Sequence, residues 1–192
     1  MESYKNNLAV SASNRSEWRQ WLENHSESYK SVWLIIYHKD SGMPSVYYSE
    51  AVDEALCFGW IDSTPNKRDS ISYYQYFAKR NPKSNWSLVN KMKVENLLAA
   101  GLMHNRGLEM VELAKKNGSW WALDEVVQLK EPEDLLFAFS ENALALTHWK
   151  QFPPSARRGI LEWILNAKQA ATRKKRIVKT VELAEQNKRA LF

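Results

Sequence analysis

The longest apolar runs of this chain have the length of a β-strand. The clearest is VWLIIY, Val32–Tyr37, which is rich in β-branched and aromatic residues and precedes a turn-forming stretch, DSGMPS. Such a run predicts a buried strand, whereas a membrane-spanning helix needs about 20 consecutive apolar residues. We therefore expect a sheet inside a globular domain, and no membrane span.

The N-terminal half alternates between helix and strand patterns. SEAVDEALCFGW carries apolar residues at helical spacing, and Glu50 lies in its first turn, where a carboxylate suits the helix dipole. WIDS and SISYYQYFA are typical of strands on either side of a turn, TPNKRD. VYY, Val46–Tyr48, is expected to be a short return strand. Together these patterns predict a small mixed β-sheet with helices.

The remainder of the chain has a helical pattern. Ser84 or Asn85 is expected to begin a helix that Gly101 closes, and the prolines of PPSARRGILEWILNAK stand where a helix tolerates them. The predicted fold class is therefore α+β, with a small mixed β-sheet and helices in the N-terminal half and a helical C-terminal half. The expected parts, packed as one compact unit, are a loose leader over 1–12, an α+β subdomain over 13–83 and a helical subdomain over 84–192.

Composition excludes several classes of protein. Of the 192 residues, 44% are hydrophobic, which is enough for a real core, and the single cysteine excludes a disulfide framework or a cysteine-rich metal site. The histidines lack ligand spacing, and the glycine-rich and nucleophile motifs of common enzymes are missing, so we expect no cofactor and no metal and lean against an enzyme. The N-terminus shows no secretory pattern, which predicts a cytoplasmic location.

The positive charge is concentrated near the C-terminus. The net charge is +5, but residues 151–192 hold ten Lys or Arg and three Glu, giving +7, while residues 1–150 give −2. This tail is a candidate surface for nucleic acid or another anion, and a solvated helix face would show the same pattern. The candidate residues are Arg173, Lys174, Arg176 and Lys179.

The only cysteine, Cys57, lies in the apolar segment ALCFGWID. A nucleophilic thiol needs a lowered pKa, which a neighbouring cation or a helix N-terminus supplies. Cys57 falls near the C-terminal end of its expected helix, and Asp53 adds negative charge one turn earlier. We interpret Cys57 as a buried structural thiol.

Polar residues gather around two segments that could form a binding cleft. Asp62 follows Trp60 at a strand start and faces a turn that contains Lys67 and Arg68. A carboxylate there acts as a base or a hydrogen-bond anchor, or else satisfies turn amides or pairs with a lysine. The segment KRNPKSNWSLVNK, residues 79–91, combines basic side chains with a helix start, which suits an anion. It is equally consistent with a capped loop whose Trp86 is a packing residue. The candidate ligand-binding residues are Trp60, Asp62, Arg80, Lys83, Ser84, Trp86, Ser87 and Asn90.

Three segments resemble one known family. The stretches EALCFGWID and SNWS, together with the last two helices, PPSARRGILEWILNAKQAATRKKRIVKTVELA, are similar to the YdeI/OmpD-associated family, also described as bacteriocin-protection proteins. The resemblance extends over roughly residues 15–187. Relatives tend to carry Pro-Arg-Arg before SNWS, whereas this chain keeps Arg80 and has Asn81 in place of an arginine. The family supplies no established reaction or catalytic residue to transfer.

The resemblance and the residues together lead to three functional hypotheses. The first is a non-catalytic binding or stress- and bacteriocin-protection protein with a cleft for a small anionic ligand or a peptide. The second is a nucleic-acid-binding protein that uses the basic C-terminal helices. The third is an enzyme with Asp62 as its base. The oligomeric state is left open.

Overall fold

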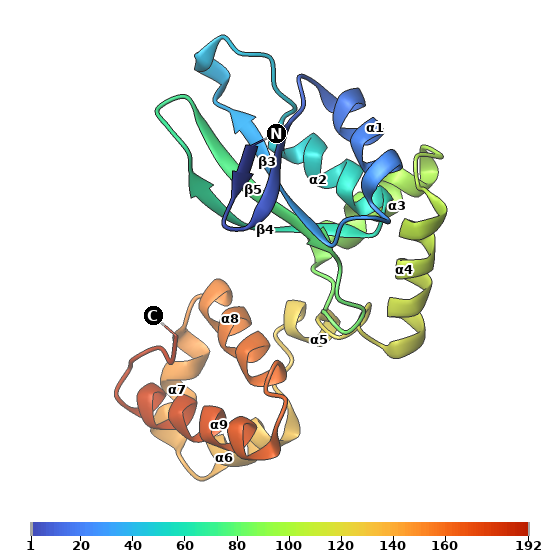
Figure 1. Ribbon diagram of the computed structural model, residues 1–192. Helices are drawn as coiled ribbons and strands as arrows, with labels where there is room; N and C mark the ends of the chain where they lie inside the picture. Colours follow the sequence, from blue (N-terminus) through green and yellow to red (C-terminus); the bar gives the residue numbers. More distant parts are fainter. Residues whose placement is uncertain (1, 192) are drawn as a thin grey trace. The chain divides into compact units, whose positions relative to one another are not determined.

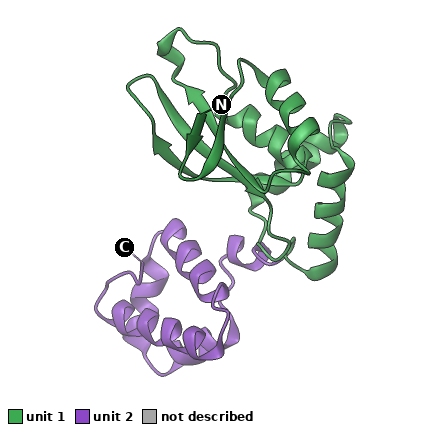
Figure 2. Cartoon of the chain, viewed as in Figure 1, with its two compact units in different colours: residues 1–121 green, residues 122–192 purple. Residues whose placement is uncertain are grey.

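The computed structural model describes residues 2–191 and contains two compact units (Figure 1). Unit 1 extends to Trp121, and unit 2 begins at Ala122 (Figure 2). The first unit combines a sheet with helices and the second is helical, so the predicted α+β class is confirmed. None of the helices within residues 2–191 is long and apolar enough to cross a membrane.

Unit 1 is built on a mixed sheet whose strands lie in the order β1-β2-β3-β5-β4. The β2 and β3 strands pair in parallel, and the other neighbours are antiparallel. The strands are β1 (Glu2–Tyr4), β2 (Asn7–Ser11), β3 (Ser31–Tyr37), β4 (Trp60–Lys67) and β5 (Ser72–Lys79). The helices are α1 (Arg15–His25), the 3-10 turn η1 (Lys39–Ser41), α2 (Tyr48–Cys57), α3 (Leu88–Ala99) and α4 (Asn105–Asn117).

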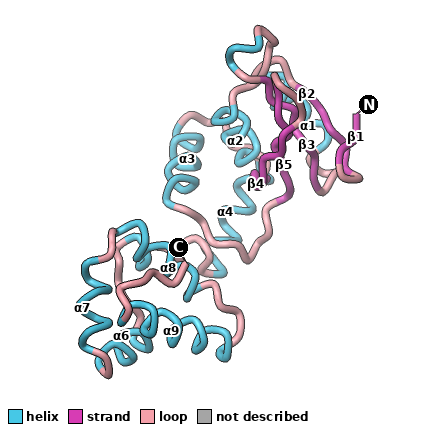
Figure 3. Tube along the Cα trace, turned by 90° about the vertical axis from the view of Figure 1, so that its left-hand side faces the viewer, coloured by secondary structure: helices cyan, strands magenta, loops and turns pink. Residues whose placement is uncertain are grey.

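The continuous apolar run of β3 is explained by burial of both faces of the strand. Alternate residues of a strand point to opposite faces. Val32, Leu34 and Ile36 belong to the main core of unit 1, which also includes residues of α1, α2, α3 and α4. Trp33 and Ile35 belong to a second cluster on the opposite face. The helices α2, α3 and α4 lie on one side of the sheet (Figure 3).

Unit 2 has its own core. Its helices are α5 (Asp124–Val127), α6 (Glu133–Ser140), α7 (Ala143–Gln151), α8 (Pro154–Leu165) and α9 (Ala170–Glu185). Their apolar faces meet in a separate cluster that includes the fully buried Leu135, Trp149 and Ile164. The break between α6 and α7 falls at Glu141–Asn142, where the Asn142 side chain accepts a bond from the Ala145 N–H, 3.0 Å away, and begins the next helix.

The structure differs from the sequence-based boundaries at three places. Residues 2–11, expected to be a loose leader, form two strands, because β2 finds its partner in the distant β3, with Ala9 opposite Trp33. Val46–Tyr48 is not a strand: Tyr48 begins α2. The division between the compact units falls after Trp121 rather than between residues 83 and 84, because apolar residues of α3 and α4 pack into the core beside the sheet.

Candidate functional site

Arg80, one of the candidate ligand-binding residues, is buried. It directly follows β5, and its side chain is only 5% exposed. Its backbone N–H donates to the carbonyl oxygen of Gly59, 2.9 Å away, which joins the end of β5 to the turn before β4. Gly59 adopts a positive φ of 72°, and a Cβ there would lie 3.1 Å from the carbonyl oxygen of Arg106. The glycine of the CFGW segment therefore allows the chain to position Arg80.

The guanidinium of Arg80 packs on an aromatic ring. Its Cζ lies 3.8 Å from the centroid of a Trp86 ring, within the range of a cation–π interaction. Its Nη2 donates to the carbonyl oxygen of Asn85, 2.5 Å away. Within residues 2–191, no carboxylate lies within ion-pair distance of Arg80, and its Nε has no hydrogen-bond partner. Burial lowers the pKa of Arg80 to about 10, so the group is still a cation at neutral pH.

Asp62 acts on Arg80 through its charge and is itself held by a tyrosine. The Asp62 carboxylate favours the charged form of Arg80 and so opposes the effect of burial. The hydroxyl of Tyr48, at the first position of α2, donates to Asp62 Oδ2 over 2.5 Å. Burial, with a further contribution from Asp62, raises the pKa of Tyr48. Tyr48 was not among the candidates from the sequence, because it lies 14 residues from Asp62 and only the fold brings them together.

The loop after Arg80 is organised by its own hydrogen bonds. The Asn81 side chain accepts from the Lys83 N–H, 2.9 Å away, and the Asn81 carbonyl accepts from the Ser84 hydroxyl, 2.7 Å away. The helix then begins at Leu88, later than expected, because Ser87 is its N-cap and accepts from the Asn90 N–H over 3.3 Å. Ser84, Ser87 and Asn90 therefore have structural contacts in this loop and cap, while Lys83 is exposed.

Trp60 and Trp86 are both buried in the core of unit 1 but have different neighbours. Trp86 packs against Trp120, with ring centroids 5.0 Å apart, and Trp60 packs edge-on against Trp21 at 6.1 Å. Trp60 borders a depression of about 210 Å³ in which Arg106 is already paired with a glutamate, Glu27. The structure thus groups Arg80, Asp62 and Trp86, while Trp60 lines a separate hollow.

Half of the predicted basic surface is engaged inside unit 2. Arg173 binds Asp134 on α6 through two hydrogen bonds of 2.6 and 2.8 Å. Arg176 donates to the carbonyl oxygen of Trp163 and lies over its ring, 5.0 Å from the centroid. Lys174 and Lys179 are exposed, and the Lys179 ammonium also lies over Trp163, at 5.6 Å. The two arginines join α9 to its neighbours, which leaves lysines on the outer face.

No group of three or more histidine, cysteine or acidic side chains in residues 2–191 is arranged to hold a metal ion.

Cys57 is buried with no exposed surface. Burial, with a contribution from the charge of Glu54, raises the pKa of its thiol to about 11. Cys57 is therefore a protonated thiol in the core at neutral pH, as the sequence predicts.

Comparison with known families assigns the two units to two different models. Residues 10–110, which are most of unit 1 and more than half of the chain, match a domain of unknown function, DUF8412. The chain belongs to the DUF8412 family. Residues 128–187, within unit 2, match the family described as bacteriocin-protection, YdeI or OmpD-associated.

The second match confirms the resemblance to that family, over a narrower part of the chain than residues 15–187. The DUF8412 domain contains the whole Arg80 site, whereas the bacteriocin-protection match contains the basic face of α9. A search of the curated proteins and a search of the solved structures found no match.

Proposed function

We propose that this DUF8412 protein is a non-catalytic binding protein with a role in stress or bacteriocin protection, and that its DUF8412 domain binds a carboxylate-bearing ligand or peptide at Arg80. The observation that carries the proposal is a buried guanidinium without a carboxylate partner among residues 2–191. The role in protection rests on the family match of unit 2. We place its action in the cytoplasm.

The energetics of burial support an anion at this position. A buried charge loses its hydration, and proteins normally compensate for that cost with an opposite charge and hydrogen bonds. Arg80 receives one carbonyl oxygen, that of Asn85, and the face of Trp86. Its Nε finds no hydrogen-bond acceptor among residues 2–191. A bound carboxylate would supply both the missing charge and the missing acceptor.

The geometry favours a planar anion. A guanidinium that rests on an aromatic face keeps its N–H donors in its own plane, at the edge. A carboxylate approaches that edge with two oxygens and accepts two parallel hydrogen bonds. The neighbouring Asp62 is an acceptor held in place by Tyr48, and it suits an N–H group of the same ligand. A peptide segment with a carboxylate and an amide N–H combines these two features.

The same contacts favour binding over catalysis. Asp62 already accepts a hydrogen bond of 2.5 Å from Tyr48, which holds the carboxylate in place. Cys57, the only thiol, is buried and protonated. Ser84 uses its hydroxyl in the loop turn. These groups are occupied in holding the site together.

The test follows the Arg80 Nε–H by NMR during titration of the full chain. The probes are N-acetyl-alanyl-alanine with a free carboxylate, the same dipeptide as its amide, and inorganic phosphate. We expect a saturable shift of the Arg80 signal with the free carboxylate, no shift with the amide and a weaker response to phosphate. The variant Arg80→Lys assigns the signal, because it lacks the Nε–H group. It also replaces the planar set of guanidinium N–H donors with one ammonium group, so it should bind the free carboxylate at least tenfold more weakly.

Arg106→Lys is the matched control, because Arg106 is an arginine of unit 1 that is already paired with Glu27. This variant should bind like the wild type. Absence of a saturable shift with both carboxylate and phosphate would overturn the proposal. Equal binding by wild type and Arg80→Lys would move the site elsewhere and overturn it as well.

A further inference from the structure

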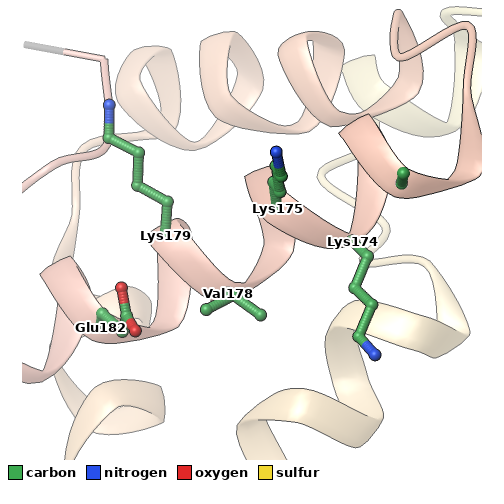
Figure 4. A pocket seen from close by; sticks show the side chains of 6 residues that line it. Lys174, Lys175, Val178, Lys179 and Glu182 are labelled. Atoms are coloured by element: carbon green, nitrogen blue, oxygen red, sulfur yellow. The ribbon is translucent and has the colours of Figure 1, made fainter.

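The outer face of α9 is a shallow basic depression with an apolar centre (Figure 4). Its volume is about 380 Å³. The side chains that line it come from α9 alone: Ala171, Lys174, Lys175, Val178, Lys179 and Glu182. Val178 lies in the middle of the face and is 44% exposed. The face therefore offers a small apolar contact with lysines around it.

The spacing of these residues gives the face a definite shape. Side chains four apart on a helix form ridges, and a partner helix packs a ridge of its own into the groove between two of them. One ridge carries Lys175 and Lys179, and the adjacent ridge carries Lys174, Val178 and Glu182. A complementary helix needs an apolar residue to contact Val178 and flanking carboxylates that reach Lys174 and Lys175 on one side and Lys179 on the other, away from Glu182.

The α6 helix of the same chain has this pattern. Phe137 is 71% exposed, more than any other large apolar side chain in residues 2–191. Glu133 and Glu141 lie four residues before and four residues after it, and both are exposed. The outer ridge of α6, continued by its C-cap residue Glu141, is therefore acidic, apolar and acidic in order. Its charge and its central side chain complement the lysines and Val178 of α9.

The two outer faces cannot meet within one molecule. The opposite sides of α6 and α9 already pack together: Leu135, Phe139 and Ile177 share the core of unit 2, and Asp134 binds Arg173. Each copy therefore presents both halves of the contact, with each half directed to another molecule. This arrangement fits a second copy of the chain as the partner.

We propose that the protein self-associates head to tail, with the outer face of α6 in one copy docked on the outer face of α9 in the next, and Phe137 placed over Val178. A nucleic-acid backbone fits the face less well, because Val178 has no role toward phosphate and Glu182 repels it. The contact is one helix on one helix, so it is small and weak. We expect a dissociation constant between about 10 μM and 1 mM.

The test uses complementary charge reversals in the full chain. The α9-reversed variant is Lys174→Glu with Lys175→Glu, and the α6-reversed variant is Glu133→Lys with Glu141→Lys. Lys179 is left unchanged because its ammonium lies over Trp163. Sedimentation velocity over a range of concentrations measures association, and circular dichroism during thermal unfolding shows that each variant is folded.

The head-to-tail geometry makes a specific prediction for mixtures. The wild type should associate as its concentration rises, and each reversed variant alone should stay monomeric, because its two faces carry the same charge. An equimolar mixture of the two variants should associate with the variants in alternation, since the acidic α6 of one meets the basic α9 of the other and the acidic α9 of the first meets the basic α6 of the second. A chain that carries both reversals should associate like the wild type.

Phe137→Ala should weaken association at least tenfold, whereas Leu113→Ala, an exposed leucine of unit 1, should leave it unchanged. Three outcomes would overturn the proposal: a wild type that stays monomeric throughout, folded variants that fail to associate when mixed, or association unaffected by Phe137→Ala. Oligonucleotide binding that the α9-reversed variant loses, with a monomeric wild type, would assign the face to nucleic acid instead.

Discussion

Two buried charged side chains in unit 1, Glu54 and Arg80, differ in the partners that the fold provides for them. Glu54, on α2, is 2% exposed and accepts hydrogen bonds from Arg15 Nε at 2.5 Å and from Arg19 Nη1 at 2.6 Å. Arg80 is 5% exposed and has an aromatic face and one carbonyl oxygen as partners. The first charge is compensated by two ion pairs, whereas within residues 2–191 no carboxylate lies within ion-pair distance of the second, and Asp62 acts on it through its charge alone.

This difference distinguishes a buried charge that stabilises the fold from a buried charge that is available to a ligand. Unit 2 follows the pattern of Glu54, because Glu131 is bound by Arg157 and Asp134 by Arg173. In these pairs the fold itself supplies the counter-charge. A buried charge that lacks one is costly unless a ligand provides it. Arg80 is therefore the position where stability and function are expected to diverge.

The largest expected effect concerns Cys57, next to Glu54 in this closed region. Because its pKa is about 11, the thiolate fraction at neutral pH is about 300-fold below that of a free thiol with a pKa of about 8.5. A thiol reagent should therefore label the folded protein at least a few hundred-fold more slowly than the unfolded protein. The raised pKa stabilises the fold below pH about 8.5, and this contribution is lost as the pH rises toward 11. Fast labelling of the native state at neutral pH would show that the region is open.

Removing the compensated charge should be strongly destabilising. Glu54→Gln leaves Arg15 and Arg19 without their shared carboxylate, and we expect a loss of about 2–3 kcal/mol in the free energy of unfolding. Chemical denaturation measures it. Glu112→Gln is the matched control, because the Glu112–Lys115 pair is exposed and should contribute about 0.5 kcal/mol or less. Equal losses of unfolding free energy in Glu54→Gln and Glu112→Gln would show that the buried Glu54 stabilises the fold no more than an exposed pair does.

A partly exposed pair in unit 2 should have a smaller effect. The Arg173 guanidinium lowers the pKa of Asp134. Because that carboxylate is 47% exposed, we expect Asp134→Asn to cost about 0.5–1 kcal/mol at neutral pH. The contribution of Asp134 is present above the unfolded-state pKa of about 3.9 and is lost as the pH falls through the lowered native value. Thermal unfolding of variant and wild type should therefore converge in acid, and a difference that persists there would point to a cause other than charge.

The stability change expected at Arg80 is small because opposing effects cancel. Arg80→Met keeps much of the side-chain volume, removes a buried charge that has no ion-pair partner within residues 2–191, and removes the Arg80 hydrogen bond to the Asn85 carbonyl oxygen. These effects oppose each other, so the free energy of unfolding should change by about 1 kcal/mol or less. The same variant should lose carboxylate binding. A loss of stability as large as that of Glu54→Gln would show that Arg80 serves the fold.

Much of the fold follows from local patterns in the sequence. The apolar run at Val32–Tyr37 indicates a buried strand, and helical spacing with the prolines at Pro153–Pro154 indicates α8. The two N-terminal strands were missed because their pairing partner is distant in the sequence, and strand signals of three and five residues are weak. The start of α3 was placed early because Ser84, Asn85 and Ser87 are all plausible N-caps, and only the turn at Asn81 excludes the first.

The candidate site was predicted in part. The sequence pointed to Asp62, Arg80 and Trp86 because a carboxylate, a basic residue and an aromatic residue stand at element boundaries. It did not include Tyr48, whose hydroxyl reaches Asp62. It also grouped Arg173 and Arg176 with the exposed lysines, because all of them are basic and lie on one helix.

The sequence by itself determined the fold class, the resemblance to the bacteriocin-protection, YdeI or OmpD-associated family and the burial of Cys57, since periodicity, motif similarity and apolar surroundings are local properties. The tertiary structure alone decided which charges are compensated. Arg80 and Arg173 are equally basic in the sequence, but a carboxylate of α6 reaches Arg173, and Trp86 covers Arg80. The energy of a charge depends on its solvent and its neighbours within a few ångströms, and residues far apart in the chain supply both.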